Sequence, residues 1–268
     1  NDLSSSPDSS FVREALGKGL LSQDRQSINP LKFGVIASTD THLGTPGAVD
    51  ESSFQGHGGA GKSFRSSIPE GLPDDIEFNP GGLAVAWAEE NSRSAIFDAF
   101  QRKEVYGTSG PRFIVRFFVG DNLDKNLCNN PDNISYAYAN ATPMGGTIAS
   151  DSLSQPSIFI SASADSSIKD QFIEKLQVVK GVVRNGELLT TVHDVGVTNA
   201  QSKLDIANCE VTGSGEKAMC SVWNDPNFNS SENAYYYVRV VANKSCRWSH
   251  NLCLQNPEYC EADSDASI

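Results

Sequence analysis

The stretch KLQVVKGVVRNGELLTTVHDV, residues 175–195, decides the fold of the second half of this chain. It holds two β-rich runs on either side of Asn185-Gly186. Asn-Gly favours the positive φ angles of a two-residue turn, so the stretch predicts a β-hairpin. Three further β-rich runs are separated by Gly, Asn, Pro and Ser, namely FIVRFFV (113–119), SIFISAS (157–163) and AYYYVRVVA (234–242). Residues 111–250 are therefore predicted to form an antiparallel, β-sandwich-like domain, followed by a cysteine-containing polar tail over 251–268.

Residues 1–110 have a different pattern, which predicts an α/β region. Apolar residues at helical spacing over 11–20 indicate a first helix. The run KFGVIAS, residues 32–38, is typical of a strand buried on both faces of a parallel sheet. Residues 39–80 form a long, glycine-rich loop without periodicity. A second helix is expected over 92–103. Its predicted buried side consists of Ile96, Phe97, Ala99 and Phe100.

Composition excludes some classes of partner. The chain has 268 residues and a formal charge of −12, from 33 acidic and 21 basic side chains. Such an acidic surface repels phosphate backbones and anionic lipids, so nucleic acid is not an expected partner. No apolar run approaches the roughly 20 residues that span a bilayer, so no membrane span is expected. The polar start NDLSSSPDSS suggests a chain that begins partway through a longer precursor.

The six cysteines favour disulfides over a zinc site. Five of them lie after residue 208 in a polar, loop-rich region, and none forms a C-x-x-C pair. Disulfides in turn predict an extracytoplasmic, periplasmic or secreted protein. Cys209–Cys220 is the first choice because the intervening loop is short and contains glycines, and Cys246–Cys253 brackets a second short loop. Connectivity cannot be deduced from sequence alone, so other pairings stay open.

Four N-x-S/T sequons are a second mark of a secretory route. They permit glycosylation only in a eukaryotic secretory host. The sequons begin at Asn133, Asn140, Asn229 and Asn243.

The segment GHGGAGKS, residues 56–63, matches the G-x-x-x-x-G-K-S pattern of phosphate-binding loops. Such a loop needs a buried strand before it and a helix after it. The preceding VDESSFQ is too polar for that strand, and Pro69 and Pro73 prevent a sustained helix. The match is therefore interpreted as coincidence, and a nucleotide-hydrolase function is rejected.

Asp40 and His42 are the stronger candidates. They follow the predicted strand 32–38 at positions i and i+2, so their side chains point the same way in an extended chain. A carboxylate and an imidazole together make half of a metal site, although D-x-H is a weak motif and Asp40 could instead cap a turn beside a packed His42.

Four other residues are candidates for contacts with substrate or with the metal ligands. Each has a plainer interpretation: a solvated loop histidine, two acidic residues that favour a helix dipole, and a surface arginine. These residues are His57, Glu89, Glu90 and Arg112.

At these positions the chain resembles a known family. KFGVIASTDTH (32–42), GGLAVAWAEENSRSAIFDAFQRKEVYGTSGPRFIVRFFVG (81–120), DPNF (225–228), AYYYVRVVA (234–242) and CRWS (246–249) are similar to the family catalogued as domain of unknown function 3604. That family is related to the polymerase-and-histidinol-phosphatase (PHP) metal-dependent phosphoesterases. The resemblance implies a C-terminal fragment of a PHP-like (β/α) barrel in residues 1–110, followed by the β-sandwich-like domain.

The resemblance also implies a function. Asp40 and His42 correspond to the late D-x-H ligand pair of the PHP fold, which would hold divalent metal ions such as Zn, Mn or Fe. The chain departs from the family pattern because it has no H-x-H motif and only four histidines. Two ligands form an incomplete site, so the expected function is part of a metal-dependent hydrolase acting on a small-molecule ester, inactive without the missing N-terminal part of the same protein. The alternative is a non-enzymatic binding or assembly module with a vestigial metal pair.

Overall fold

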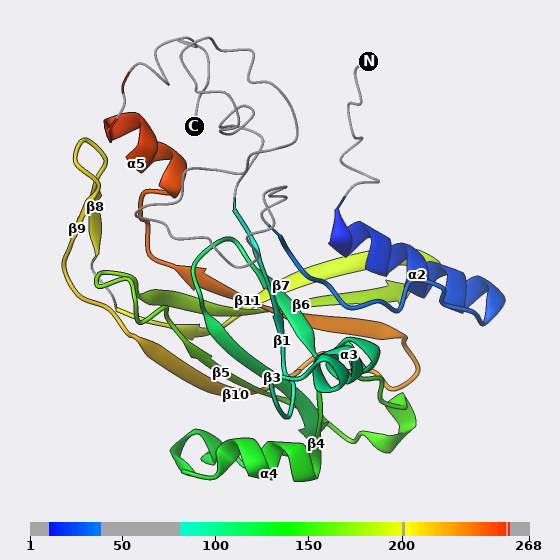
Figure 1. The fold of residues 1–268 in the computed structure, drawn as a ribbon. Coiled ribbons are helices and arrows are strands. Elements are labelled where there is room, and N and C mark those ends of the chain that lie inside the picture. Colours follow the sequence, from blue (N-terminus) through cyan, green and yellow to red (C-terminus); the bar gives the residue numbers. More distant parts are fainter. Residues whose placement is uncertain (1–10, 39–80, 200–201, 256, 258–268) are drawn as a thin grey trace, which may run out of the picture.

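The computed structural model describes residues 11–38, 81–199, 202–255 and 257. Two antiparallel sheets dominate these residues (Figure 1). The four-stranded sheet has the order β10-β5-β3-β4, with β3 (Ile114–Asp121), β4 (Ala141–Pro143), β5 (Pro156–Ser163) and β10 (Ala218–Asn224). The three-stranded sheet has the order β11-β6-β7, with β6 (Ile173–Arg184), β7 (Glu187–Val197) and β11 (Ala234–Ala242).

The β6–β7 hairpin confirms the prediction from Asn185-Gly186. Arg184 pairs with Glu187 across the turn, and Asn185 and Gly186 have φ angles of 53° and 77°. Positive φ at both central residues gives the turn a twist that matches the flanking strands. The hairpin supplies most of the three-stranded sheet.

The two sheets pack face to face around one apolar core. Side chains alternate along each strand, so every second residue of β5 and β6 points between the sheets. Ile158 and Ile160 of β5 meet Leu176 and Val178 of β6 there, and all four are fully buried. The predicted β-sandwich character of this region is confirmed.

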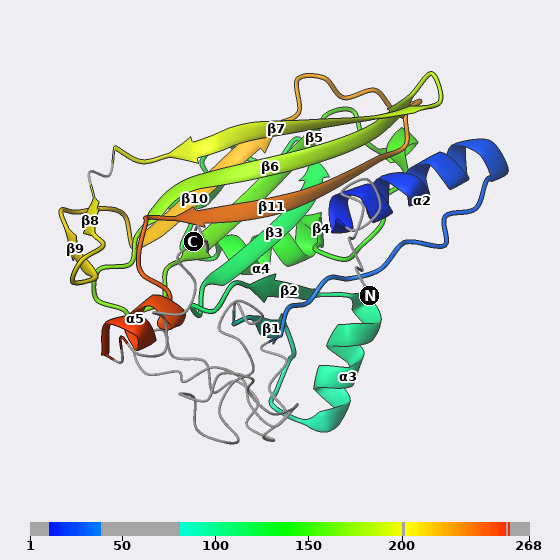
Figure 2. The ribbon, with the colours of Figure 1, turned by 90° about the horizontal axis from the view of Figure 1, so that it is seen from above.

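Helices cover the outer faces of the sandwich (Figures 1 and 2). The opposite residues of the four-stranded sheet, Phe118 and Phe159, pack with Leu127 and Ala137 in a second apolar cluster. Leu127 belongs to the 3-10 helix η2 (Leu127–Asn129) and Ala137 to α4 (Asn133–Asn140). Helix α2 (Val12–Gln26) lies across the three-stranded sheet. The layers are thus α2, three-stranded sheet, four-stranded sheet and α4.

A smaller unit precedes the sandwich in the sequence. Strands β1 (Leu83–Ala86) and β2 (Val105–Thr108) form an antiparallel pair joined through α3 (Arg93–Arg102). The second predicted helix is confirmed, and its N-terminus is capped by Ser92, whose Oγ accepts a hydrogen bond from Ala95 N at 3.2 Å. The remaining short elements are η3 (Ser150–Ser152), β8 (Lys203–Asp205), β9 (Glu210–Thr212) and α5 (Trp248–Gln255).

The predicted parallel strand over 32–38 is wrong. This segment has no strand assignment, and Phe33, Val35 and Ile36 are exposed. The described residues contain neither a closed barrel nor a parallel strand pair, so they do not show a PHP-like barrel fragment. An apolar run indicates that a segment favours burial, but the sequence alone does not show which other residues would bury it. The domain boundary near residue 110 stays a prediction.

The structure confirms disulfides but corrects their pairing. Cys220 bonds to Cys128, not to Cys209, and Cys209 bonds to Cys246, not to Cys220. The expected Cys246–Cys253 pair is therefore also wrong, although Cys253 is itself disulfide-bonded. The short-loop argument failed because the fold brings η2 beside β10, and the β8–β9 turn beside the approach to α5.

A buried ion pair joins the two sheets. Lys180 Nζ of β6 lies 2.6 Å from Asp225 Oδ2, directly after β10, and both residues are at most 5% exposed. Lys180 Nζ also donates to Asn227 O at 2.8 Å, and Tyr236 Oη of β11 donates to Asp225 Oδ2 at 2.7 Å. Burial opposes ionisation of Asp225, but the hydrogen bonds from Lys180 and Tyr236 outweigh it and hold the pKa of this carboxyl below its usual range.

Removing the cation alone should destabilise the sandwich strongly. Lys180→Met leaves the Asp225 carboxylate buried without a counter-charge, which costs about 3–5 kcal/mol. The double variant Lys180→Met/Asp225→Asn removes both charges and keeps an acceptor for Tyr236, so it should recover most of that loss. Urea unfolding measures both free energies. A double variant as unstable as the single one would contradict this role of the buried charge.

The two disulfides should differ in their contribution to stability. Cys128–Cys220 spans 92 residues and Cys209–Cys246 spans 37. Chain entropy alone predicts contributions of about 4.6 and about 3.8 kcal/mol. The paired Cys→Ala variants should therefore both lose stability in urea unfolding, Cys128→Ala/Cys220→Ala more than Cys209→Ala/Cys246→Ala. The reverse order would show that native contacts, rather than loop closure, set the difference.

Candidate functional site

The predicted metal pair Asp40 and His42, and His57, lie outside the described residues. The segment that leads to them is described as far as Ser38, and it crosses close to the β1–β2 pair. A Cβ on Gly82 would lie 2.8 Å from Ser38 O, and one on Gly107 would lie 2.8 Å from Ala37 N. Only glycine permits so close a backbone approach. The chain therefore enters the D-x-H motif directly beside β1 and β2.

A separate apolar surface lies on α3, which joins β1 to β2 at the end of the pair away from Gly82. We define the α3 face as Ile96, Phe97 and Phe100, which line an open depression together with Arg93 and Ser94. The predicted burial of Phe97 and Phe100 is wrong, because these side chains are 60% and 41% exposed. Only Ala99 of the predicted buried side is fully covered. Large adjacent apolar side chains on a surface typically mark a site of interaction.

Segment 32–38 runs from the end of α3 along β2, because Gly34 lies against Lys103 and Val105 and Ala37 lies against Gly107. Lys103, which follows α3, donates from Nζ to Lys32 O at 2.8 Å and so ties the segment to the end of the helix. Beyond that bond, Phe33, Val35 and Ile36 are exposed. The exposed apolar side chains of segment 32–38 therefore lead toward the predicted metal-binding motif, whereas the α3 face lies at the other end of the β1–β2 pair.

A buried carboxylate that sequence reasoning missed anchors this unit to the sandwich. Glu104 is 4% exposed, accepts a hydrogen bond from Tyr138 Oη of α4, and lies 4.0 Å from Arg116 Nη1 of β3. Arg116 also donates to Tyr138 Oη at 2.7 Å, and its guanidinium carbon lies 3.2 Å from the centre of the Trp87 ring. Burial raises the pKa of Tyr138, and the bond to Glu104 raises it further.

This cluster positions α3 relative to the sandwich. Its carboxylate, phenol and guanidinium groups bind one another. Trp87 Nε1 also donates to Val115 O at 3.0 Å, which adds a second link from β1 to β3. In the sequence, this cluster is indicated only by Arg116, a cation inside the run FIVRFFV, because a charge in a predicted strand needs a partner.

The other candidates are not brought together. Glu89 and Glu90 are exposed in the turn that precedes α3. Arg112 is exposed, and its backbone N–H donates to Asp165 Oδ2 at 2.7 Å. Contacts of these side chains with an anionic substrate stay predictions.

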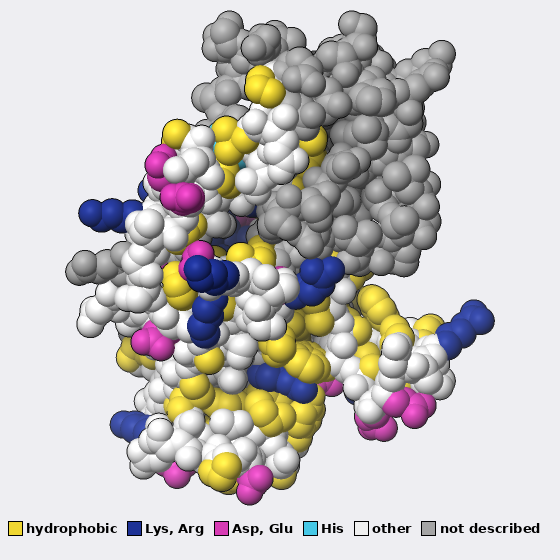
Figure 3. Space-filling model, turned by 60° about the vertical axis from the view of Figure 1, so that its left-hand side comes forward, with side chains coloured by type: hydrophobic (Ala, Val, Ile, Leu, Met, Phe, Trp, Pro, Cys, Tyr) yellow, Lys and Arg dark blue, Asp and Glu magenta, His cyan; other side chains and the backbone are white. Residues whose placement is uncertain are grey.

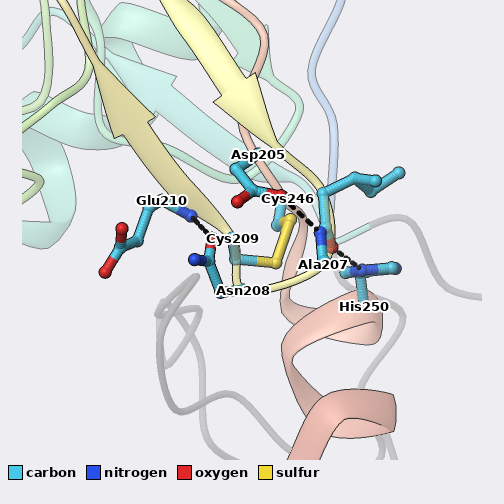
Figure 4. Close-up of a disulfide and its surroundings, with 8 residues drawn as sticks. Asp205, Ala207, Asn208, Cys209, Glu210, Cys246 and His250 are labelled. Carbon is cyan, nitrogen blue, oxygen red and sulfur yellow. Dashed lines mark hydrogen bonds between the residues drawn. A yellow bond between two sulfur atoms is a disulfide. The ribbon is translucent and has the colours of Figure 1, made fainter.

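One group in the described residues has metal-ligand composition, and it is unsuited to a metal. Cys209 Sγ, Cys246 Sγ and a ring nitrogen of His250 lie within 4.8 Å of one another (Figure 4). The two sulfurs are bonded to each other, so neither is a thiolate ligand. His250 Nε2 lies 2.9 Å from Ile206 O, to which it donates. The group is therefore a structural link between the β8–β9 hairpin and α5.

Comparison with known proteins gives one match. A family model described as "Protein of unknown function (DUF3604)" matches residues 1–268. No curated protein and no solved structure matches the chain. Among the described residues, no helix has the length and apolar character needed to cross a membrane.

The loop that holds Arg112 should make stability depend on pH. Burial would raise the pKa of Asp165, but hydrogen bonds from Ser167 and from Arg112 N outweigh it and lower the pKa. A depressed folded-state pKa stabilises the fold above the unfolded-state pKa, and this contribution is lost as the pH falls through the folded-state value.

Asp165→Asn should therefore cost about 1–3 kcal/mol at pH 7, through weaker hydrogen bonds, and the difference from wild type should shrink between about pH 5 and pH 2. Urea unfolding across this range measures it. Asp151→Asn, at an exposed position in η3, is the matched control and should change little. A constant difference for Asp165→Asn at all pH values would rule out the linkage.

Proposed function

Because the chain belongs to the DUF3604 family, we propose that it is part of a PHP-like metal-dependent hydrolase, a phosphoesterase, with Asp40 and His42 as two of the metal ligands. Two observations support the ligand assignment: the D-x-H spacing, and the similarity of residues 32–42 to the family motif.

The donor chemistry suits a divalent metal. One carboxylate and one imidazole fit Zn, Mn or Fe, and the group formed by Cys209, Cys246 and His250 does not compete while its disulfide is intact. When bound, such a metal would polarise an ester oxygen and activate water for attack on a small-molecule ester. The role of this chain would be to fix the carboxylate of Asp40 and the imidazole of His42 at one side of that metal.

We further propose that the other ligands come from outside these 268 residues, from the remainder of the same protein. The exposed α3 face carries this proposal. Phe97 and Phe100 project from a helix whose base is fixed by the Glu104 cluster, and segment 32–38, with its own exposed apolar side chains, runs from the end of that helix along β2 toward Asp40. A rigid apolar surface at this position suits a permanent contact with the rest of a catalytic domain.

Location is part of the proposal. The disulfides Cys128–Cys220 and Cys209–Cys246 favour an oxidising compartment. An extracytoplasmic hydrolase acting on small-molecule esters agrees with them.

A non-enzymatic binding or assembly module is the second candidate. The exposed α3 face favours it too, because the same apolar surface could seat a different protein. In that case Asp40 and His42 would be vestigial. The metal content of the intact protein separates the two candidates.

In the intact natural protein, Asp40→Ala and His42→Ala should each remove bound metal, measured by elemental analysis after gel filtration. Both should also abolish hydrolysis of a phosphomonoester or phosphodiester probe. Asp151→Ala changes an exposed carboxylate far from the motif in sequence and should retain both properties.

Unchanged metal content in both D-x-H variants would refute the ligand assignment. A wild-type protein that holds no metal and hydrolyses no ester probe would instead favour the binding module.

A further inference from the structure

The four sequons differ sharply in the surroundings that the fold gives them. Asn243 is 4% exposed. Its Oδ1 accepts from Phe172 N at 2.7 Å, and its Nδ2 donates to Asp170 O at 3.0 Å. The side-chain amide thus fastens the end of β11 to the start of β6 and has no room for a substituent.

Asn229 has the opposite surroundings. It is exposed in the turn between β10 and β11. Its Oδ1 accepts from Ser231 N at 3.0 Å and from Ser231 Oγ at 2.8 Å, so the asparagine and the serine of the sequon bind each other in a local turn. The Asn229 side chain also hydrogen-bonds Glu232, and an amide nitrogen with one substituent keeps one N–H for this bond, so the exposed turn can accept a substituent without a change in the sheets.

Asn140 is also exposed, at the last residue of α4. Its Nδ2 donates to Tyr136 O at 2.9 Å. An amide nitrogen that carries one substituent keeps one N–H, so this bond can survive modification. Asn133, at the start of the same helix, is half-buried and is left out of the assignment.

We propose that Asn140 and Asn229 carry N-linked glycans when this protein is made in a eukaryotic secretory compartment, and that Asn243 does not. In the transfer, Asn Nδ2 attacks C1 of a lipid-pyrophosphate-linked oligosaccharide. The C1–N bond forms, the C1–O bond to the pyrophosphate breaks, the nitrogen loses one proton, and the lipid pyrophosphate leaves. No group is oxidised or reduced.

The disulfides are compatible with such a compartment. Cys128–Cys220 and Cys209–Cys246 favour an oxidising environment, and the eukaryotic secretory lumen, where N-glycosylation takes place, provides one. Because transfer precedes complete folding, a glycan added at Asn243 would leave a chain that cannot bury that side chain. The protein that folds and is secreted should therefore carry an unmodified Asn243.

The test is site mapping on protein secreted from eukaryotic cells. Enzymatic deglycosylation in heavy-oxygen water converts each glycosylated Asn into labelled Asp, which peptide mass spectrometry detects. We expect label at Asn140 and Asn229 and none at Asn243. Label at Asn243 in folded protein, or its absence from either exposed site, would overturn the proposal.

Sequon variants give an independent measurement. Asn140→Gln and Asn229→Gln should each remove the mass of one glycan, and Ser231→Ala should remove the Asn229 glycan while keeping the asparagine. Asn243→Gln should lose no glycan mass from the secreted protein, although it should lower the thermal midpoint. Loss of a glycan in Asn243→Gln would contradict the assignment.

Discussion

The ion pair between Lys180 and Asp225 determines how the two sheets sit on each other. Most other contacts between the sheets are apolar and define no direction, although Ser221 Oγ of β10 also donates to Val195 O of β7 at 2.7 Å. A buried ammonium that must reach both Asp225 Oδ2 and Asn227 O allows one alignment of β6 against the end of β10. Tyr236 adds a third strand to the same constraint. Removing two charges from water costs free energy, and this cost is compensated only where all these partners are in place. The ion pair therefore favours the native alignment of the sheets over other alignments.

A second set of polar contacts fixes the smaller unit. Arg116 is the pivot, because its guanidinium stacks on Trp87 after β1 and also donates to Tyr138 of α4. Glu104 completes the set from the start of β2. The α3 face is thereby presented by a rigid base, although its own side chains are exposed. A surface held in this way loses little conformational freedom when another molecule covers it.

Local signals predicted local structure well. Asn185-Gly186 favours a turn at its own position, and Ser92 caps the helix that begins directly after it. Both features depend on neighbouring residues only, so the sequence indicates them correctly. Partners distant in the chain could not be predicted in this way. Cys128 meets Cys220 because β10 pairs with β5, a consequence of topology that leaves no trace in loop lengths. The apolar runs at 32–38 and on α3 predict buried segments, but both are exposed, because hydrophobicity indicates that a residue favours burial and does not indicate which residues would bury it. Asp40 and His42 were found from spacing and resemblance, and their geometry stays a prediction.

The order of the strands has a consequence for synthesis. The chain leaves each sheet and later returns: β10 comes back to β5 with partners 55 to 67 residues apart, and β11 comes back to β6 at a similar separation. While a ribosome is still producing residues 164–217, β5 has β3 on one side and a bare hydrogen-bonding edge on the other. Such non-local pairing slows folding and leaves an edge open to other chains. The nascent protein is therefore most exposed to aggregation in this interval, before β10 arrives and Cys220 can find Cys128.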